Sequence, residues 1–560
     1  MKRMYRAIAA VLCLSLCLGL CGCVQENALQ DSTVVPDSTV SAETPEGVMD
    51  YAALQPQPFD SEAFLDRLLE AEKMLDTDAG TAAVIGEYYA LTALLLECMT
   101  SYTLYDIACY TDVTDTALQQ KSAVAYEKAV DCSDAYSVFL SNILKSRYRE
   151  DYIAEVGEEN ALMYEDYEAM SEEQKELADR EKALQDEYRL LAAEAYDSYE
   201  ATAEVMAPLY VELVQLRNHI AETYGYDDYV TYAYENTYYR SYTPEQAAQL
   251  GEIVKEELAP LYVRSMLAES REDQEAFFRV SDTDEETLLT LMQQYIPLMD
   301  SALGASLQHM LDTHSYNIAY SEKKHAASFT TMLYQYGVPF LFSQPEKESQ
   351  PLSLGTLVHE FGHYHSFLVD PTYDTPDGYI YSLDDIDVAE ISSTTLELLF
   401  LEFYPELYGQ DAAALQRGSI SGILSNVVFG CMFDEFQQII YTTPDLQPQD
   451  ISDIFHEVML DYMGDIFVDD YSYHMWAVVN HNFEAPLYYV SYAMSALAAF
   501  QIWADAQADY DAALQAYLEL AAYGTNVDFL ELLEACGMRS VLDEGYLQEL
   551  HGVLEPVLQP

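Results

Sequence analysis

The chain has 560 residues, of which 50% are hydrophobic and 12% aromatic, and its 96 Asp and Glu against 25 Lys and Arg give a formal net charge of −71. Nucleic-acid binding is excluded as a function class, because contact with phosphates needs clustered basic residues. Direct adhesion to anionic lipid is disfavoured for the same reason. Disordered acidic chains are poor in aromatic residues, so this chain is expected to bury a large core.

The N-terminal segment is predicted to be a signal peptide. Three basic residues precede an apolar, uncharged run over residues 7–22, which is too short to span a bilayer comfortably as a mature helix. The run ends at Cys23 in a context that resembles the lipobox of bacterial lipoproteins. We therefore expect residues 1–22 to be removed and a lipidated Cys23 to hold the protein at the outer face of the cytoplasmic membrane. An ordinary secretory signal is the alternative.

Residues 23–58 are predicted to be a flexible tether. The segment is polar, contains four prolines and repeats Asp-Ser-Thr-Val, a composition typical of linkers. Such a tether would hold the folded part away from the membrane.

Cysteine use beyond the signal peptide is sparse. No two of these cysteines form a C-x-x-C pair, so neither a cysteine zinc site nor a disulfide scaffold is indicated, and most should be buried as small hydrophobic residues. They are Cys98, Cys109, Cys132, Cys431 and Cys536.

From residue 59 onward the apolar spacing predicts a mainly α protein. Met170, Leu177, Leu184 and Leu191 recur every seven residues, which predicts a long helix packed along one seam. We place a boundary after this helix, with an N-terminal helical domain over 59–200 and a catalytic domain over 201–560.

The clearest non-helical stretch runs from Ser328 to Phe342. Two apolar, β-prone runs flank Gly337, which predicts a pair of strands. Pro339 favours an edge position because it has no backbone N–H to donate, and an edge strand could bind an extended peptide through its backbone.

The motif that carries chemistry is H-E-x-x-H at His359, Glu360 and His363, in a segment that is predicted to be helical from about Ser353. Two histidines four residues apart project from one helical face and can bind a single ion. Zinc suits two imidazoles, one carboxylate and an open water position. Glu360 is then placed to accept the proton of the metal-bound water.

A third ligand is expected from a following helix. Glu390 lies far enough beyond His359 for the chain to form a loop and return, in a segment with helical spacing for which Asp387 is a possible N-cap. Glu397 lies on the same face and could orient a ligand histidine, with direct ligation as the alternative. Asp384 and Asp385 are expected to be solvated in the loop.

Several further segments accompany this motif, and together they resemble the oligoendopeptidase F and thimet-oligopeptidase family of zinc metallopeptidases over roughly residues 60–560. The matching pieces are the H-E-F-G-H segment with A-E-I-S-S-T after it, Arg217 to Tyr229, Ala327 to Thr330, Tyr336 to Phe340, and Trp476 to Ala493. One departure is Ser366, where family members usually carry another His; His365 lies one position earlier, on another face of the helix.

The resemblance implies a mainly α, two-lobed metallopeptidase that encloses a deep channel, with a small β edge segment beside the H-E-x-x-H helix. It implies one zinc ion held by His359, His363 and Glu390, with Glu360 as the general base. It also implies that His481, Tyr488 and Tyr492 stabilise the oxyanion and position the substrate, and a hydroxyl or imidazole N–H is a suitable donor for that purpose. The chain carries all seven of these side chains.

The function expected from this set is zinc-dependent hydrolysis of short unfolded peptides by a monomeric endopeptidase. The alternative is a membrane-tethered lipoprotein that binds peptides without turnover, although a pure binder has no need of Glu360. If acidic residues line the channel, basic peptides should enter preferentially and their rates should fall as salt rises.

Overall fold

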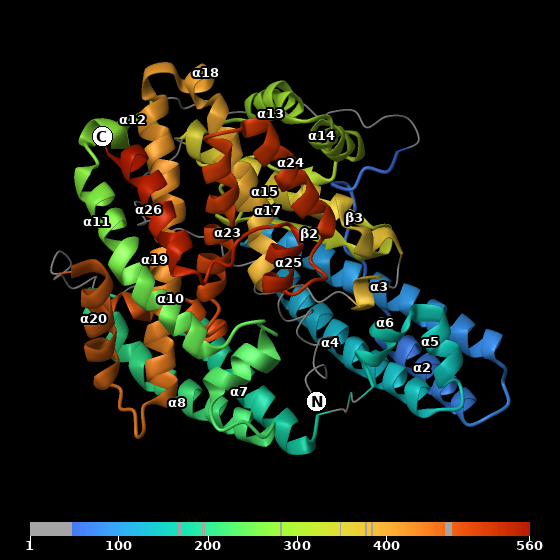
Figure 1. The fold of residues 1–560 in the computed structure, drawn as a ribbon. Coiled ribbons are helices and arrows are strands. Elements are labelled where there is room, and N and C mark those ends of the chain that lie inside the picture. The colour runs from blue at the N-terminus through green and yellow to red at the C-terminus, as the bar shows by residue number, and fades with distance from the viewer. Residues whose placement is uncertain are drawn as a thin grey trace. The chain divides into compact units, whose positions relative to one another are not determined.

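The computed structural model describes residues 48–165, 167, 170–192, 194, 196–279, 283–347, 349–375, 378–381, 385–464 and 473–559. The predicted signal peptide, Cys23, most of the tether and Asp384 lie outside the described residues. The described chain is mainly α, with one small sheet of three strands (Figure 1). The prediction of a mainly α protein with a small β segment is therefore confirmed.

The described residues form two compact units, each built from two segments of sequence. Within the described residues, the sheet unit comprises 48–167 and 275–381 and contains all three strands. Its elements are α2 (Ser61–Leu75), α3 (Thr81–Thr111), α4 (Thr116–Lys145), α5 (Arg149–Val156), α6 (Glu158–Leu162), α13 (Glu285–Met299), α14 (Ser301–Thr313), β1 (Tyr316–Asn317), β2 (Ser328–Leu333), β3 (Val338–Ser343), α15 (Gln350–Val369) and α16 (Gly378–Tyr381).

Within the described residues, the helical unit comprises 170–274 and 385–559. Its elements are α7 (Glu172–Ala192), α8 (Tyr199–Thr223), α9 (Tyr229–Tyr232), α10 (Pro244–Glu257), α11 (Ala259–Ala268), α17 (Ile386–Phe400), α18 (Tyr404–Tyr408), α19 (Ala412–Thr442), α20 (Asp450–Met463), α22 (His481–Glu484), α23 (Val490–Ala506), α24 (Tyr510–Tyr523), α25 (Phe529–Ala535) and α26 (Glu544–Leu558); α12 (Arg271–Phe277) lies where the first segment ends.

The two units divide the chain at other positions than the boundary expected near residue 200. The long helix predicted from the seven-residue repeat is α7, and its seam residue Leu184 is fully buried. This seam packs against α8, and Glu181 of α7 pairs with Arg217 of α8 at 2.7 Å. Because α7 buries its apolar face on the helix that follows it, α7 groups with later elements.

The sheet has the strand order β1-β3-β2, so β3 is its central strand. β3 pairs antiparallel with β2, with Phe329 opposite Phe342, and parallel with β1. Pro339 thus lies in the central strand, and the expectation of an edge position for it is wrong. The physical reason is that β1 pairs only with Leu341 and Phe342, so the β1 side of β3 needs no N–H at Pro339.

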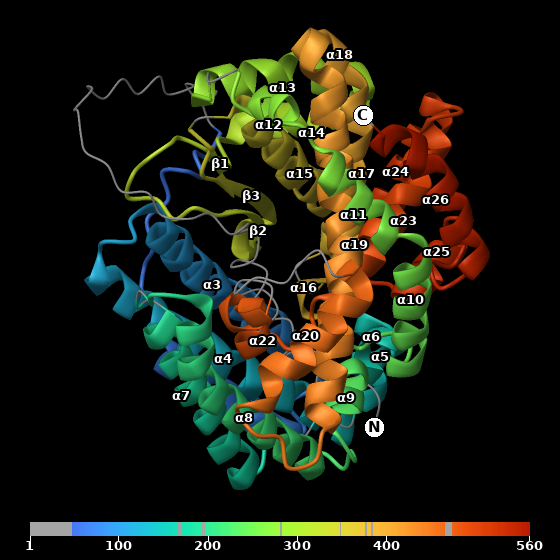
Figure 2. The ribbon, with the colours of Figure 1, turned by 90° about the vertical axis from the view of Figure 1, so that its left-hand side faces the viewer.

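The sheet is covered by helices on both faces. Side chains alternate between the faces of a strand, and Phe329 and Leu333 of β2 cluster with Ile107 of α3. On the other face, α15 packs against β2 and β3 (Figure 2). α3 is long and apolar enough to cross a membrane by composition alone, but it packs against α2, α4 and β2 as a core helix does. The sheet therefore positions α15, which carries the predicted motif.

Candidate active site

The two histidines of the motif lie one turn apart on α15. This helix begins at Gln350, where the Ser349 hydroxyl accepts a hydrogen bond from the backbone N–H of Leu352. The imidazole centroids of His359 and His363 are 5.2 Å apart, and both side chains are half-buried. The predicted helical face with two imidazoles side by side is therefore present.

Glu360 is held between α15 and the sheet. Its side chain is only 1% exposed. The Thr330 hydroxyl of β2 lies 3.1 Å from the Glu360 carboxylate oxygen Oε2 and 2.9 Å from the Glu360 backbone oxygen, either of which can accept its proton. A carboxylate fixed in this way has a restricted orientation, as a general base requires. The sequence pattern around Thr330 belongs to the resemblance, but no role for this hydroxyl could be deduced from it.

His365 belongs to the structural core of the sheet unit. Its Nδ1 lies 2.8 Å from the Ser306 hydroxyl of α14, and the side chain is 1% exposed. Burial lowers its pKa to about 4, so the imidazole is neutral at pH 7. The contact with α14 agrees with the expectation that His365 is not a third histidine ligand.

Glu390 lies in the second turn of α17, in the helical unit. The Ser393 hydroxyl is within 2.9 Å of its Oε2, and Glu390 is half-buried. Glu397 lies seven residues further on the same helix, also half-buried, where its charge raises the pKa of the buried Tyr404 after burial itself. Both acidic candidates are thus on one helix.

The N-cap of α17 is Asp385 rather than Asp387. The Asp385 carboxylate accepts from the backbone N–H of Asp387 at 2.9 Å and from that of Phe529 at 3.1 Å. Asp385 is 6% exposed, so its expected solvation is wrong, and burial together with the neighbouring Asp387 raises its pKa well above the ordinary value. Two acidic residues in the loop both fit the capping pattern, and tertiary contacts decide between them.

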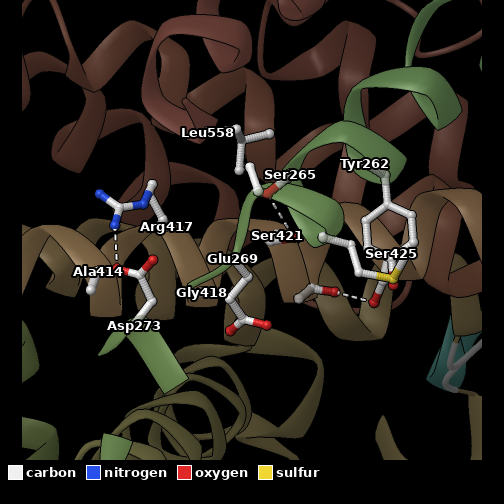
Figure 3. A pocket seen from close by; sticks show the side chains of 13 residues that line it. Tyr262, Ser265, Glu269, Asp273, Ala414, Arg417, Gly418, Ser421, Ser425 and Leu558 are labelled. Carbon is white, nitrogen blue, oxygen red and sulfur yellow. Dashed lines mark hydrogen bonds and ion pairs between the residues drawn. The ribbon is translucent and has the colours of Figure 1, made fainter. Parts of the chain in front are cut away.

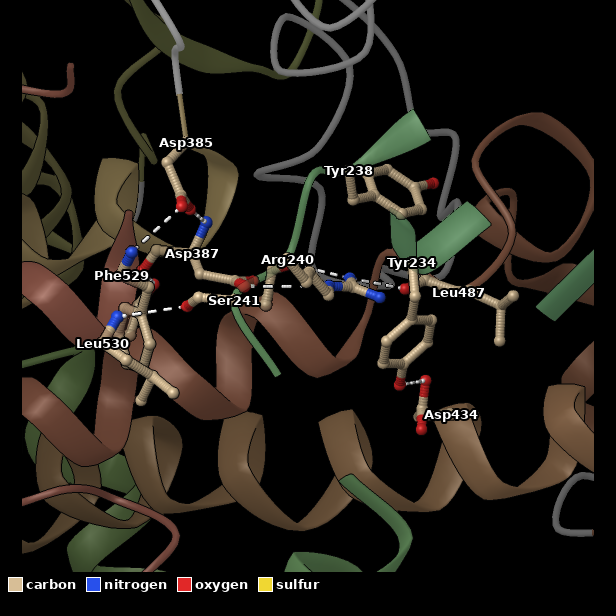
Figure 4. A network of polar contacts seen from close by, with 12 residues as sticks. Tyr234, Tyr238, Arg240, Ser241, Asp385, Asp387, Asp434, Leu487, Phe529 and Leu530 are labelled. Carbon is tan, nitrogen blue, oxygen red and sulfur yellow. Dashed lines mark hydrogen bonds and ion pairs between the residues drawn. The ribbon is translucent and has the colours of Figure 1, made fainter. Parts of the chain in front are cut away.

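Asp387 instead faces a buried arginine. Its Oδ2 lies 3.7 Å from the Nε of Arg240, and both side chains are fully buried (Figure 4). The Arg240 guanidinium also stacks on the rings of Tyr234 and Tyr238 at 4.4 and 4.6 Å. Its Nη2 donates to the backbone oxygen of Leu487 at 2.7 Å. Arg240 therefore connects the start of α17 to the segment that leads into α23.

The predicted His and Tyr residues of the C-terminal segment lie together in the helical unit. The imidazole of His481 is 5.4 Å from the ring of Tyr488 and 6.0 Å from that of Tyr492, centroid to centroid. Tyr489 is closer still, at 4.6 Å, and also packs on Phe433 at 4.9 Å. The contact between Tyr489 and His481 was not predicted, because the sequence does not show which of several neighbouring tyrosines faces the imidazole.

The imidazole of His481 is buried without a hydrogen-bond partner. Neither of its ring nitrogens is hydrogen-bonded to any described residue, although the side chain is only 4% exposed. Burial lowers its pKa to about 3, so the ring is neutral. A neutral imidazole carries one N–H, which is a donor ready for an external acceptor.

The backbone around His481 is fixed by long buried side chains. Arg217 donates to the Phe483 backbone oxygen at 2.5 Å, and Gln437 accepts from the Leu487 backbone N–H at 2.6 Å. Leu487 has φ 65°, a left-handed conformation that costs energy for a non-glycine residue and persists only when neighbours enforce it. Arg217 was part of the resemblance, but Gln437 and Arg240 carried no sequence signal.

The predicted residues thus fall into three local groups. His359, Glu360 and His363 lie on α15 of the sheet unit, and Glu390 lies on α17 of the helical unit. His481, Tyr488 and Tyr492 form a ring cluster in the helical unit.

A separate cavity of about 220 Å³ lies between α11, α19 and α26 of the helical unit (Figure 3). Two of its charged side chains pair with each other, because Arg417 donates to Asp273 at 2.6 Å. The Ser265 hydroxyl lies 3.2 Å from that of Ser421. None of the predicted site residues lines this cavity, so it is not the candidate active site.

Comparison with known protein families shows what the region that contains these groups is similar to. Residues 312–552 match peptidase family M3. A search of curated proteins gives no match. The range that matches includes the H-E-x-x-H motif, Glu390 and the His and Tyr cluster.

Solved structures share the fold at low sequence identity. PZ peptidase A with inhibitor 2 is 19% identical with a TM-score of 0.74, over 91% of this chain and 99% of that chain. A crystal structure assigned to oligoendopeptidase F is 20% identical with a TM-score of 0.75, over 91% and 98%. Metallocarboxypeptidase 1 of Trypanosoma cruzi is 12% identical with a TM-score of 0.59, over 87% and 98%. The fold thus occurs in proteins named as endopeptidases and as carboxypeptidases.

Proposed function

Because residues 312–552 match peptidase family M3, we propose that the chain is a zinc-dependent endopeptidase that hydrolyses short unfolded peptides. The observation that carries the proposal is the intact H-E-x-x-H on α15, with two imidazoles 5.2 Å apart and a buried Glu360 between them in sequence. A metallopeptidase needs both a metal site and a base, and this helix supplies the residue types for both.

The ligand set proposed for the metal is His359, His363 and Glu390. Two neutral imidazoles and one carboxylate suit zinc and leave a position open for water and substrate. When bound, a zinc ion would lower the pKa of water and polarise the scissile carbonyl. The Ser393 hydroxyl beside Glu390 would help to orient that carboxylate, because partners of ligand groups commonly fix their geometry.

Glu360 is the proposed general base. Its carboxylate would accept the proton of the attacking water and return it to the amine of the leaving product. The Thr330 hydroxyl, 3.1 Å from Oε2, would keep the carboxylate in one orientation during both transfers. Removal of one such orienting contact should therefore lower turnover without removing the metal.

His481, with Tyr488 or Tyr492, is the proposed oxyanion donor. The His481 ring is neutral and its N–H has no acceptor among the described residues, so it can donate to the developing negative charge without first breaking another bond. Tyr488 is fully buried and Tyr492 is half-buried. Both tyrosine rings contact the imidazole, and either hydroxyl has the chemistry of a second donor.

The decisive experiment uses Glu360→Gln with purified full-length protein and quenched fluorescent peptides. We expect wild-type protein to contain one zinc per chain and to cleave the peptides. Glu360→Gln should retain zinc and lose about 1,000-fold in kcat, because it lacks the oriented base. Wild-type cleavage rates in the variant would refute the mechanism. Peptide binding by the wild-type protein without any cleavage would favour the tethered peptide-binding lipoprotein instead.

Two further comparisons test the finer assignments. Glu390→Gln should lose zinc, whereas Glu397→Gln should keep it; the reverse would make Glu397 the ligand. Peptides blocked by N-acetylation and C-amidation should still be cut internally, because an endopeptidase needs neither terminus. Failure on blocked peptides, with removal of C-terminal residues from free ones, would assign a carboxypeptidase.

We also propose that the peptidase acts outside the cell as a monomer, held by a lipid on Cys23. The proposal rests on the lipobox-like context of Cys23. Cys23→Ala should release the protein from the membrane fraction of cells, and light scattering of the detergent-extracted wild-type protein should give the mass of one chain. Membrane retention of Cys23→Ala would refute the lipid anchor.

A further inference from the structure

Two buried cysteines lie on neighbouring helices of the sheet unit. Cys98 is on α3 and Cys132 is on α4, and both are free thiols that are at most 2% exposed. α3 and α4 pack against each other along their length (Figure 1). No local motif in the sequence connects these two cysteines, so their proximity could not be predicted from it.

The register of the helix pair places the two cysteines opposite each other. The hydroxyls of Thr92 and Tyr136 are 2.6 Å apart, and the rings of Tyr102 and Tyr126 are 5.4 Å apart. Thr92 and Tyr102 are as far apart in sequence on α3 as Tyr126 and Tyr136 are on α4. The two helices therefore pair antiparallel in a single register. Cys98 and Cys132 both lie between these contacts.

Small residues allow the helices to approach closely at this level. Ala129, Ser133 and Ser137 surround Cys132 on the buried face of α4. A disulfide needs Cα atoms within about 7 Å, and helices reach such separations only where the side chains between them are small.

The two thiols interact directly. A hydrogen bond between the Cys98 and Cys132 side chains, with burial as the next cause, raises the pKa of Cys98 above its ordinary value. The positive charge of Lys128 acts on Cys98 in the opposite direction. The two thiols therefore lie within hydrogen-bonding reach of each other, and the Lys128 charge offsets part of the effect of burial on the Cys98 thiol.

We propose that Cys98 and Cys132 form a disulfide that cross-links α3 to α4 when the chain meets a small disulfide oxidant or a thiol–disulfide oxidoreductase. This modification goes beyond the proposed peptidase function and does not depend on it. A cross-link between two helices would constrain the first helices of the sheet unit, which carry no predicted active-site residue.

The cavity beside Cys98 gives the oxidant a route. It has a volume of about 350 Å³, and Phe59, Lys128 and Cys98 are among the residues that line it. The Cys98 thiol would lose its proton, and the resulting thiolate would attack one sulfur of the oxidant, break its S–S bond and release the other sulfur as a thiolate that takes up this proton. The Cys132 thiolate would then attack Cys98 Sγ, release the second thiol and leave the Cys98–Cys132 bond. Two electrons pass from the cysteine pair to the oxidant.

The test treats the reduced full-length protein with glutathione disulfide, alkylates the remaining thiols and maps peptides by mass spectrometry without reduction. We expect one linked peptide pair that contains Cys98 and Cys132, and alkylated Cys109, Cys431 and Cys536. Cys109 lies on the same helix as Cys98 and is the internal control. Glutathione adducts alone, linkage of other cysteines, or unmodified Cys98 and Cys132 would overturn the proposal.

A stability measurement supplies a second readout. The cross-link should raise the thermal midpoint of the oxidised wild-type protein by roughly 5 °C over the reduced protein, because it constrains the unfolded chain. Cys109→Ser should keep this redox dependence, and Cys98→Ser should lose it. Equal midpoints of oxidised and reduced wild-type protein would overturn the proposal even if the serine variant does not fold.

Discussion

The arginine at position 217 offers the sharpest test of how the candidate site is held in place. Arg217 is fully buried and makes three charged contacts, to the Glu181 carboxylate at 2.7 Å, the Tyr441 hydroxyl at 3.0 Å and the Phe483 backbone oxygen at 2.5 Å. Phe483 follows His481 by two residues. Arg217→Met keeps an unbranched apolar side chain in place of the arginine stem but removes all three donors.

The expected loss of unfolding free energy depends on which buried groups lose their partner. Removal of one partner from a buried ion pair costs about 3–5 kcal/mol of unfolding free energy. Glu181 is 25% exposed and can regain some water, so we expect the lower end, about 3 kcal/mol. Looser placement of the His481 segment should lower kcat/KM by roughly 10- to 100-fold, because small misplacements of catalytic groups are costly.

The assay is chemical unfolding followed by fluorescence, with kcat/KM measured where each variant is fully folded. The matched control is Arg180→Met, because Arg180 pairs with Glu212 between the same two helices but is 52% exposed. An exposed pair contributes at most about 1 kcal/mol. If both variants lost the same small amount of unfolding free energy, or if Arg217→Met kept full activity, the reasoning about the buried arginine would be refuted.

Four other predictions concern Thr330, His481, the pH dependence of stability and the net charge. Thr330→Val should lower kcat about 10-fold by loss of the hydroxyl beside Glu360, whereas Thr330→Ser should retain the wild-type rate; equal rates for both variants would argue against an orienting role. His481→Phe should lower kcat roughly 100-fold while unfolding free energy stays the same or rises, since both ring nitrogens lack partners; a large loss of stability would contradict this. Because burial lowers the His481 pKa to about 3, the unfolded chain binds the extra proton first as pH falls below about 6.5; wild-type stability should decrease by up to about 1.4 kcal/mol per pH unit between pH 6.5 and 3, and this part of the pH dependence should be absent from His481→Phe. With a net charge of −71, kcat/KM for basic peptides should exceed that for acidic ones and fall as salt rises; a preference for acidic peptides that is insensitive to salt would refute this.

The features that could be predicted from the sequence are those set by local spacing. Two histidines four residues apart determine a helical face wherever the helix lies, so His359 and His363 needed no tertiary information. The β-prone runs around Gly337 predicted two paired strands for the same reason. The third strand, β1, has only two residues and leaves no pattern, which is why the central position of β3 could not be foreseen.

The features that were missed depend on residues far apart in the chain. Asp385 and Asp387 are equally good caps by composition, and Arg240, from a distant segment, determines that Asp387 is the buried partner. The orienting hydroxyl of Thr330 depends on how β2 packs against α15. The facing thiols of Cys98 and Cys132 depend on the register of two helices. Each of these is a contact between elements, and composition or periodicity within one element does not encode it.

The energetics around His481 support its proposed role as an oxyanion donor. A buried polar group without a hydrogen-bond partner costs about 1–3 kcal/mol, and neither nitrogen of this ring has one among the described residues. The backbone on both sides is nevertheless held firmly, by Arg217 at Phe483 and by Gln437 at Leu487. A donor that already had an internal acceptor would have to break that bond before it could bind a ligand. A rigid frame around a ring that lacks a partner is therefore the arrangement that a preorganised oxyanion donor requires.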